Sequence, residues 1–160
     1  LPEAIIYPTG GGTGLIGMWK AFGELKAAGF VEGPMPRFFS VQSDGCAPVV
    51  KAFESGAETT EPWKDAWTVA SGLRVPAPLG GRLMLRALRE SKGGAVAVSD
   101  GALTEAQRML ASLEGVDACP EGGAAVAAAH ILLDRGIVAR DARLVLFNTG
   151  AGVLYGQDLK

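Results

Sequence analysis

The sequence predicts an α/β fold in which a mainly parallel sheet carries helices on both faces. Short apolar runs of strand length alternate along the chain with longer stretches of helical periodicity, as in βαβ units. The 160 residues suffice for one domain with a hydrophobic core, and no internal repeat or low-complexity tract interrupts them. We therefore expect residues 1–160 to form a single domain.

The first half of the chain begins with a strand at residues 4–7 and a helix at 15–28 that ends before Gly29, a residue suited to a C-cap. A second strand is expected at 37–42, and Pro48 can open a short helix that runs to Phe53. The apolar stripe of the first helix should pack in the core. It consists of Leu15, Met18, Trp19, Phe22 and Leu25.

Residues 57–80 have weak periodicity, three prolines and two tryptophans. A stretch of this length without regular structure inside a compact domain is usually functional. We expect part of the active site there, with a plain surface connection as the alternative.

The second half continues the alternation with a helix at 82–91, a strand at 94–98 and a helix to residue 113 that Ser99 can cap. The helix at 82–91 should expose Arg86, Arg89 and Glu90 to solvent and bury Leu83, Leu85 and Leu88. A short edge strand at 117–119, an alanine-rich helix at 121–135 and a last strand at 143–147 should follow. Thr149 then comes at the carboxyl edge of the sheet, where ligands of parallel sheets bind.

Composition and charge exclude several classes of function. The chain is 48% hydrophobic and 20% charged, as folded proteins are, and its net charge of −2 offers no general attraction to nucleic acid or to anionic membranes. No apolar stretch approaches the length of a membrane span. Cys46 and Cys119 stand far apart and are expected to be free buried thiols in a reducing, cytoplasmic setting. The single histidine, His130, cannot build a metal site without carboxylates or thiolates nearby.

The loop at residues 8–14, Pro-Thr-Gly-Gly-Gly-Thr-Gly, is the most informative segment. Four glycines and two short hydroxyl side chains let backbone N–H groups converge on an anion, and the following helix directs the positive end of its dipole at that point. An ordinary strand-to-helix turn needs one glycine rather than four. The loop therefore predicts a phosphate site formed by Thr9, Gly10, Gly11, Gly12, Thr13 and Gly14.

Several phosphate loops share this placement after a strand. The Gly-Lys-Ser/Thr of nucleotide hydrolases is absent. The spacing Gly12-x-Gly14-x-x-Gly17 matches the dinucleotide fingerprint, so a dinucleotide-binding module stays open. The acidic residue that this fingerprint needs about 20 positions on has only the late Asp44 as a candidate, and the pattern does not explain Gly10 and Gly11.

Three segments in the same order resemble threonine synthase and its relatives, the fold-type II pyridoxal-phosphate enzymes with a tryptophan-synthase-β-like fold. They are the loop at 8–14, Cys-Pro-Glu-Gly-Gly-Ala-Ala at 119–125, and Phe-Asn-Thr-Gly-Ala-Gly at 147–152. Residues 68–76, which we call the strap, match more loosely the family's segment beside the active site. The resemblance spans nearly the whole chain and implies pyridoxal 5'-phosphate as cofactor.

The resemblance also implies roles for single residues. The loop at 8–14 would bind the cofactor phosphate, and Thr149 would hydrogen-bond the pyridine nitrogen, which a hydroxyl leaves largely unprotonated. Glu121 is a candidate to face the cofactor ring, although a carboxylate in the first turn of a helix also suits the helix dipole. Candidates for substrate contact are Ser71, Gly72 and Arg74.

One expected residue is missing. The family holds its cofactor as a Schiff base on a lysine of a Ser-x-Lys segment upstream of the phosphate loop, whereas this loop begins at residue 8 and the chain opens on Leu1. We therefore expect the C-terminal half of a longer enzyme, without its catalytic lysine. The lysines present lie in charged or surface-helical contexts: Lys20, Lys26, Lys51, Lys64, Lys92 and Lys160.

At the level of threonine synthase, the resemblance implies conversion of O-phosphohomoserine and water to threonine and phosphate by the intact enzyme. The implied partners are an amino-acid substrate, the N-terminal half and a second copy in a homodimer. A β-eliminating lyase or amino-acid dehydratase is the close alternative, and a catalytically inactive fragment is another.

Overall fold

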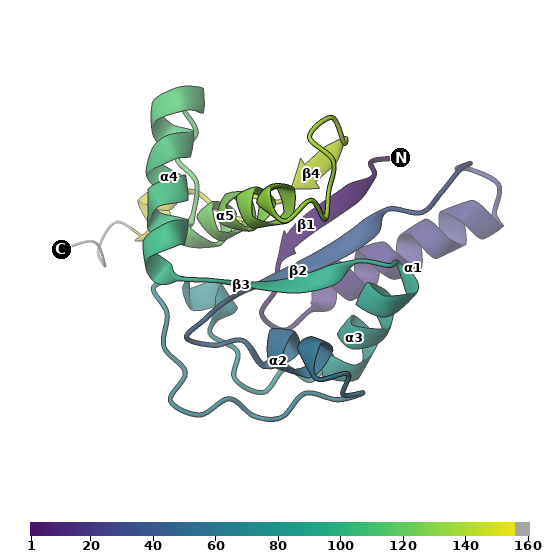
Figure 1. The fold of residues 1–160 in the computed structure, drawn as a ribbon, viewed down its shortest axis with the longest axis horizontal. Coiled ribbons are helices and arrows are strands. Elements are labelled where there is room, and N and C mark those ends of the chain that lie inside the picture. Colours follow the sequence, from purple (N-terminus) through teal and green to yellow (C-terminus); the bar gives the residue numbers. More distant parts are fainter. Residues whose placement is uncertain (156–160) are drawn as a thin grey trace.

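A computed structural model describes residues 1–155, and its sheet confirms the predicted α/β class (Figure 1). Lys160 lies outside the described residues. The strands in the described range pair only in parallel, in the order β3-β2-β1-β4. Each lies within one residue of its predicted bounds at either end. They are β1 (Ala4–Pro8), β2 (Arg37–Ser43), β3 (Gly94–Val98) and β4 (Leu144–Leu146).

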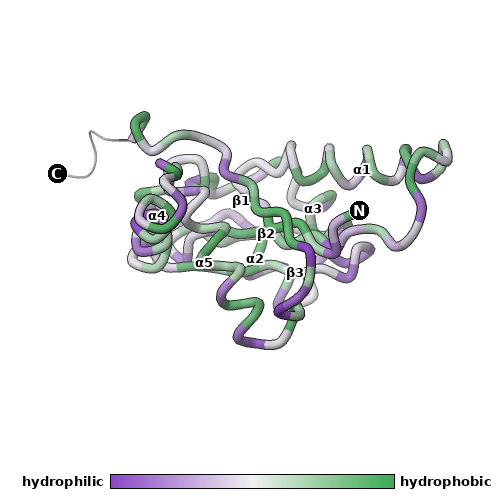
Figure 2. The backbone as a smooth tube through the Cα atoms, turned by 90° about the horizontal axis from the view of Figure 1, so that it is seen from above, coloured by the Kyte–Doolittle hydropathy of each residue, from purple (hydrophilic) through white to green (hydrophobic). Residues whose placement is uncertain are grey.

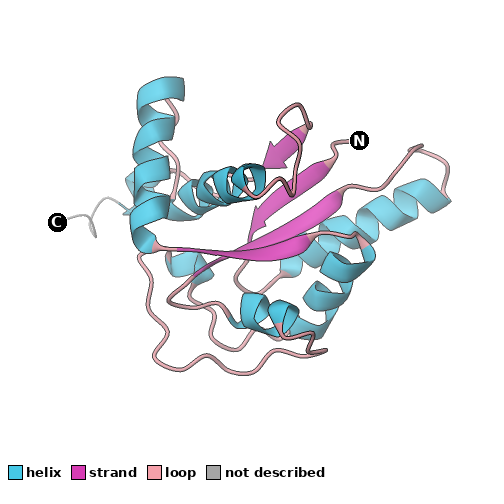
Figure 3. Cartoon of the chain, in the orientation of Figure 1, coloured by secondary structure: helices cyan, strands magenta, loops and turns pink. Residues whose placement is uncertain are grey.

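The helices also lie where the periodicity and the capping residues place them (Figure 3). The Ser99 hydroxyl accepts a hydrogen bond from the N–H of Ala102 at 3.2 Å and caps α4 as predicted. The expected edge strand at 117–119 is reduced to a single antiparallel bridge between Ala118 and Ala151. The α-helices are α1 (Thr13–Ala27), α2 (Pro48–Glu54), α3 (Gly81–Glu90), α4 (Asp100–Glu114) and α5 (Pro120–Asp134), with 3₁₀ turns η1 (Ser71–Leu73) and η2 (Gly152–Tyr155).

Alternating side chains of the strands supply a core on each face of the sheet. Ile6 and Phe39 pack with α4 and α5, whereas their chain neighbours Ile5 and Phe38 pack with α1, α2 and α3. This period of two puts apolar residues on both sides of each central strand, as buried parallel strands require. Seen from above, the strand traces between the helices are mostly hydrophobic (Figure 2).

Two expectations about buried faces need correction. In α1 only Leu15 is fully buried and Leu25 is 40% exposed, because the far end of this helix extends beyond the sheet (Figure 1). In α3, Leu83 is 46% exposed, and Met84 occupies the core beside Leu85 and Leu88. The exposed positions of the arginines on α3 agree with the prediction.

The strand order creates a switch point between β1 and β4. From β1 the chain adds β2 and then β3 on one side, and it returns to add β4 on the other side of β1. In open parallel sheets, ligands bind at such a point, in the crevice outside the carboxyl ends of the strands. The N–H of Phe147 bonds to the carbonyl oxygen of Ile6 at 3.2 Å, so the loops that follow β1 and β4 leave the sheet as neighbours.

Candidate functional site

An open cleft of about 280 Å³ lies at this switch point. It brings together segments that stand far apart in the sequence: the loop after β1, the strap, the first turn of α5 and the loop after β4. The lining residues are Tyr7, Pro8, Gly10, Gly11, Gly12, Thr13, Gly14, Gly72, Leu73, Glu121, Thr149 and Tyr155.

The glycine loop ends in the N-cap of α1, and its geometry suits an anion. Gly12 has a φ of 87°, which favours glycine, and no side chain caps the helix. The N–H groups of the first helical turn have no partner within the helix and point toward its N-terminal end. A Cβ on Gly11 would meet nothing within 4 Å, so the cleft is open at that residue. The residues present therefore fit a phosphate group.

Gly10 and Thr9 support the loop from behind. A Cβ on Gly10 would overlap the carbonyl oxygen of Gly72, so the absence of a side chain lets the loop and the strap meet. Thr9 is fully buried, and its hydroxyl donates to the carbonyl oxygen of Tyr7 at 2.8 Å. Thr9 thus lies beneath the loop and does not line the cleft.

Two carboxylates at helix N-termini hold the strap. Asp100 accepts hydrogen bonds from the Thr68 hydroxyl at 2.5 Å and from the Val69 N–H at 3.0 Å. Glu121 Oε1 accepts from the Gly72 N–H at 2.8 Å. The expected active-site segment therefore borders the cleft through Gly72 and Leu73.

The other two strap candidates lie outside the cleft lining. Ser71 is exposed, and the Arg74 guanidinium lies 5.2 Å from the centre of the Trp67 ring in a cation–π contact. Ser71 nevertheless lies within hydrogen-bonding reach of the Tyr155 phenol, which lines the cleft. A role for either in substrate contact remains a prediction.

Glu121 is only 4% exposed, and its second carboxylate oxygen, Oε2, is buried with no hydrogen-bond partner among residues 1–155. The Tyr155 phenol lies within hydrogen-bonding reach of the Glu121 carboxylate and can supply a donor to it. Burial, together with the charge of Glu121, raises the pKa of the neighbouring Tyr155 phenol. Neither Tyr7 nor Tyr155 was predicted from the sequence as a site residue. The only signal was the position of Tyr7 at the carboxyl end of a parallel strand.

Thr149 lines the cleft from the loop after β4. This loop is fastened to α5 by the Cys119 N–H, which donates to the Gly150 carbonyl oxygen at 3.1 Å and to Asn148 Oδ1 at 3.3 Å. Thr149 and the glycine loop therefore lie in the walls of one cavity.

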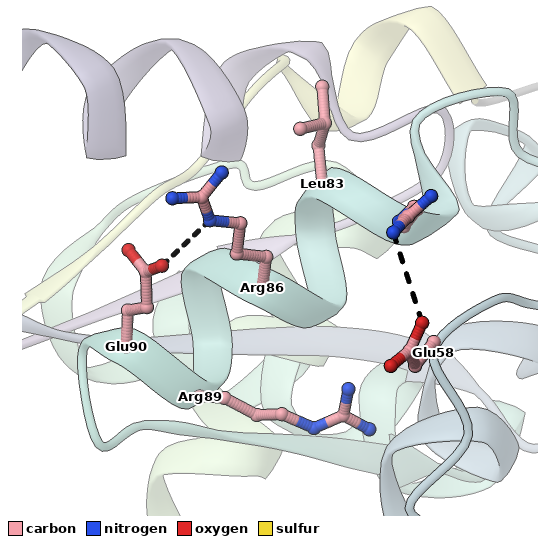
Figure 4. Close-up of a pocket in the computed structure, with 6 residues that line it drawn as sticks. Glu58, Leu83, Arg86, Arg89 and Glu90 are labelled. Carbon is pink, nitrogen blue, oxygen red and sulfur yellow. Dashed lines mark hydrogen bonds and ion pairs between the residues drawn. The ribbon is translucent and has the colours of Figure 1, made fainter.

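A larger cavity of about 470 Å³ on the outer side of α3 has a different character (Figure 4). Its arginines are already engaged: Arg86 Nε lies 2.7 Å from Glu90, and Arg89 donates to the Ala57 carbonyl oxygen at 2.6 Å. Arg82 lies 3.9 Å from Glu58. These exposed pairs form a solvated face, as predicted, rather than a phosphate clamp.

The described residues show neither a metal-ligand cluster nor a membrane-spanning helix. Within residues 1–155, no three His, Cys, Asp or Glu side chains gather as metal ligands. None of the helices in this range is both long and apolar enough to traverse a bilayer.

A glycine loop at a helix N-terminus and a hydroxyl at the switch point of a parallel sheet define a cofactor-binding α/β domain. The family model for pyridoxal-phosphate dependent enzymes matches residues 1–150, and the chain belongs to this family. The match confirms the resemblance and the cofactor that it implied.

The relatives match nearly the whole length of this chain. Threonine synthase of Methanocaldococcus jannaschii is 34% identical over 96% of the chain, and threonine synthase of Methanosarcina acetivorans is 35% identical over 94%. A solved threonine deaminase from T.th. superposes with a TM-score of 0.70 at 26% identity over 94% of the chain. The chain spans 38%, 37% and 49% of the lengths of these three proteins.

Proposed function

We propose that this chain is the cofactor-binding part of a pyridoxal-phosphate enzyme that converts O-phosphohomoserine and water to threonine and phosphate. The observation that carries the proposal is that the glycine loop and Thr149 line one cleft at the switch point of the sheet. The identity to two threonine synthases over nearly the whole chain supports this reaction.

Each group of the cleft has a role in this proposal. The backbone N–H groups of the loop, from Gly10 to Gly14, and the α1 dipole hold the cofactor phosphate. The Thr149 hydroxyl pairs with the ring nitrogen, and Glu121, which holds the strap through Gly72, faces the cofactor ring. When bound, the cofactor supplies the electron sink for proton removal and for loss of the leaving group from the substrate.

Residues 1–160 would supply these contacts as one domain, while the lysine that binds the cofactor covalently would come from an N-terminal part of the enzyme. The share of the relatives' length that the chain spans supports this division. The isolated chain should therefore bind the cofactor without turnover.

A titration with pyridoxal phosphate tests the cleft. Gly11→Val fills the open side of the glycine loop, so the Kd should rise at least about tenfold, or about 1.4 kcal/mol. Gly23→Val is the matched control, because a Cβ there also meets nothing within 4 Å but lies on α1 outside the cleft. An unchanged Kd for Gly11→Val would contradict the proposed phosphate site.

A dehydratase is the second candidate, because the threonine deaminase structure shares 26% identity and the fold. Product assays with the intact enzyme distinguish the two reactions. Phosphate release and threonine formation from O-phosphohomoserine support the synthase, whereas ammonia and 2-oxobutanoate formed from threonine support the dehydratase. Binding of NAD but not of pyridoxal phosphate would contradict both.

A further inference from the structure

Gln42 is a fully buried amide near the carboxyl end of β2, beside the glycine loop. Its Nε2 donates to the Thr9 carbonyl oxygen at 3.1 Å. Its Oε1 accepts from the N–H groups of Val49 at 2.8 Å and Val50 at 3.3 Å. The side chain does not line the cleft, so any role in cofactor binding acts through the residues that it holds.

The start of α2 fixes the orientation of the Gln42 amide. The N-cap of α2, Ala47, has no side chain that can accept a hydrogen bond, and the N–H groups of a first helical turn lack partners within the helix. Val49 and Val50 therefore need an acceptor, which only the amide oxygen can supply. The amide nitrogen is left to face the Thr9 carbonyl oxygen.

The Thr9 carbonyl in turn determines where the next N–H points. No peptide bond in the described residues is cis, and in a trans peptide the C=O and the following N–H point in opposite directions. Because Gln42 holds the Thr9 carbonyl oxygen, the Gly10 N–H points away from Gln42.

The Gly10 N–H is a free donor in the cleft wall. Gly10 is buried and lines the cleft, and its N–H makes no hydrogen bond to a backbone group of residues 1–155. A buried N–H without an acceptor is rare in folded proteins. Its position in the cleft wall therefore suits an acceptor on a bound anion.

We propose that Gln42 is a positioning residue that fixes the Thr9–Gly10 peptide so that its N–H donates to the phosphate of the cofactor. This inference rests on the proposed function. Without the Gln42 amide, the Thr9 carbonyl oxygen loses its donor and the peptide is free to rotate. Rotation would turn a carbonyl oxygen toward the phosphate in place of an N–H, and two groups of negative charge would then face each other.

Gln42→Met tests this role, because methionine is similar in length but has no amide. The Kd is measured for pyridoxal phosphate and for pyridoxal, which lacks the phosphate. The Kd for pyridoxal phosphate should rise about tenfold, as for the loss of one hydrogen bond to a charged group, while the Kd for pyridoxal stays the same. A merely structural role would weaken the binding of both ligands alike, and that result overturns the proposal.

Ser91→Ala is the matched control. Ser91 Oγ accepts a hydrogen bond from the Phe38 N–H at 3.1 Å, so this variant removes a side-chain bond at the opposite end of β2. Both variants should melt at a lower temperature than the wild type, but the ratio of the two Kd values should change only in Gln42→Met. The same change in both variants would show that the ratio reports a general loosening of β2.

The wild-type chain offers a measurement that needs no variant. On saturation with pyridoxal phosphate, the Gly10 amide proton should move downfield in the NMR spectrum, because a hydrogen bond to a charged oxygen deshields it. An unmoved resonance overturns the proposal. Absence of pyridoxal phosphate binding by the wild type would overturn the proposed function as well, whereas normal binding with an unchanged Kd ratio in Gln42→Met overturns the role of Gln42 alone.

Discussion

Adjacent glycines of the phosphate loop lack a side chain for different reasons. Gly10 makes room for the strap, since a Cβ there would overlap the Gly72 carbonyl oxygen, whereas Gly11 borders open space. Gly10→Ala should therefore lower the free energy of unfolding by about 1–3 kcal/mol, as overpacking does. Gly11→Ala should change it by less than about 0.5 kcal/mol. Urea unfolding measures both, and equal losses would show that the loop and the strap are not in contact.

The residues of the glycine loop could be predicted because their composition is unusual by itself. Which side chains face the cleft could not be predicted from that composition. Thr9 belongs to the same loop, yet its hydroxyl turns back to the carbonyl oxygen of Tyr7. Arg74 carries a charge suited to a substrate, yet its guanidinium lies over Trp67. Side-chain direction depends on neighbours from other segments, so the sequence around each residue does not reveal it.

At the scale of elements, the strap depends on carboxylates from α4 and α5. Glu121→Ala removes the acceptor of the Gly72 N–H, so the amide hydrogen of Gly72 should exchange with solvent faster than in the wild type. Glu121→Gln is the matched control, because its amide oxygen can still accept and should keep most of the protection. Hydrogen exchange by NMR gives both rates. Equal protection in the alanine variant would mean that the carboxylate does not hold the strap.

The opposite end of the strap offers an independent prediction. Asp100→Ala removes the acceptor shared by the Thr68 hydroxyl and the Val69 N–H. Exchange should accelerate at Val69 while the Gly72 amide, which Glu121 holds, stays protected. Acceleration at both amides to the same extent would show that the strap opens as one unit.

Elements with a strong local signal were predicted to within one or two residues. Strands and capped helices depend on periodicity and on a few terminal residues, such as Ser99 before α4. The buried faces of α1 and α3 were predicted less well, with Leu25 and Leu83 exposed. Periodicity identifies an apolar stripe but not how much of it a neighbouring layer covers.

For the whole molecule, alkaline pH should lower stability. Burial raises the pKa of the Cys46 thiol and of the Tyr155 phenol. The folded chain then holds these protons more tightly than the unfolded chain, so the free energy of unfolding falls as the pH rises above about 8.5, the ordinary value of a thiol. Melting curves between about pH 7 and pH 10 should show this fall.

Cys46→Ala isolates the thiol's share of the effect. The stability of the wild type should decline more steeply above about pH 8.5 than that of the variant, because only the wild type has this thiol to ionise. Parallel pH profiles would show that Cys46 does not contribute.

The sequence by itself determined the alternating elements, the anion loop and the class of cofactor, because each of these depends on residues that are close together in the chain or on segments that match a family in order. The resemblance had grouped Gly72 and Glu121 with Thr149, whereas only the tertiary structure decided that Tyr155 lines the same cleft and that the Cys119 sulfur lies next to that threonine. That grouping follows from the strand order, which puts β4 beside β1. Strand order results from long-range packing of whole layers, and no local pattern of residues encodes it.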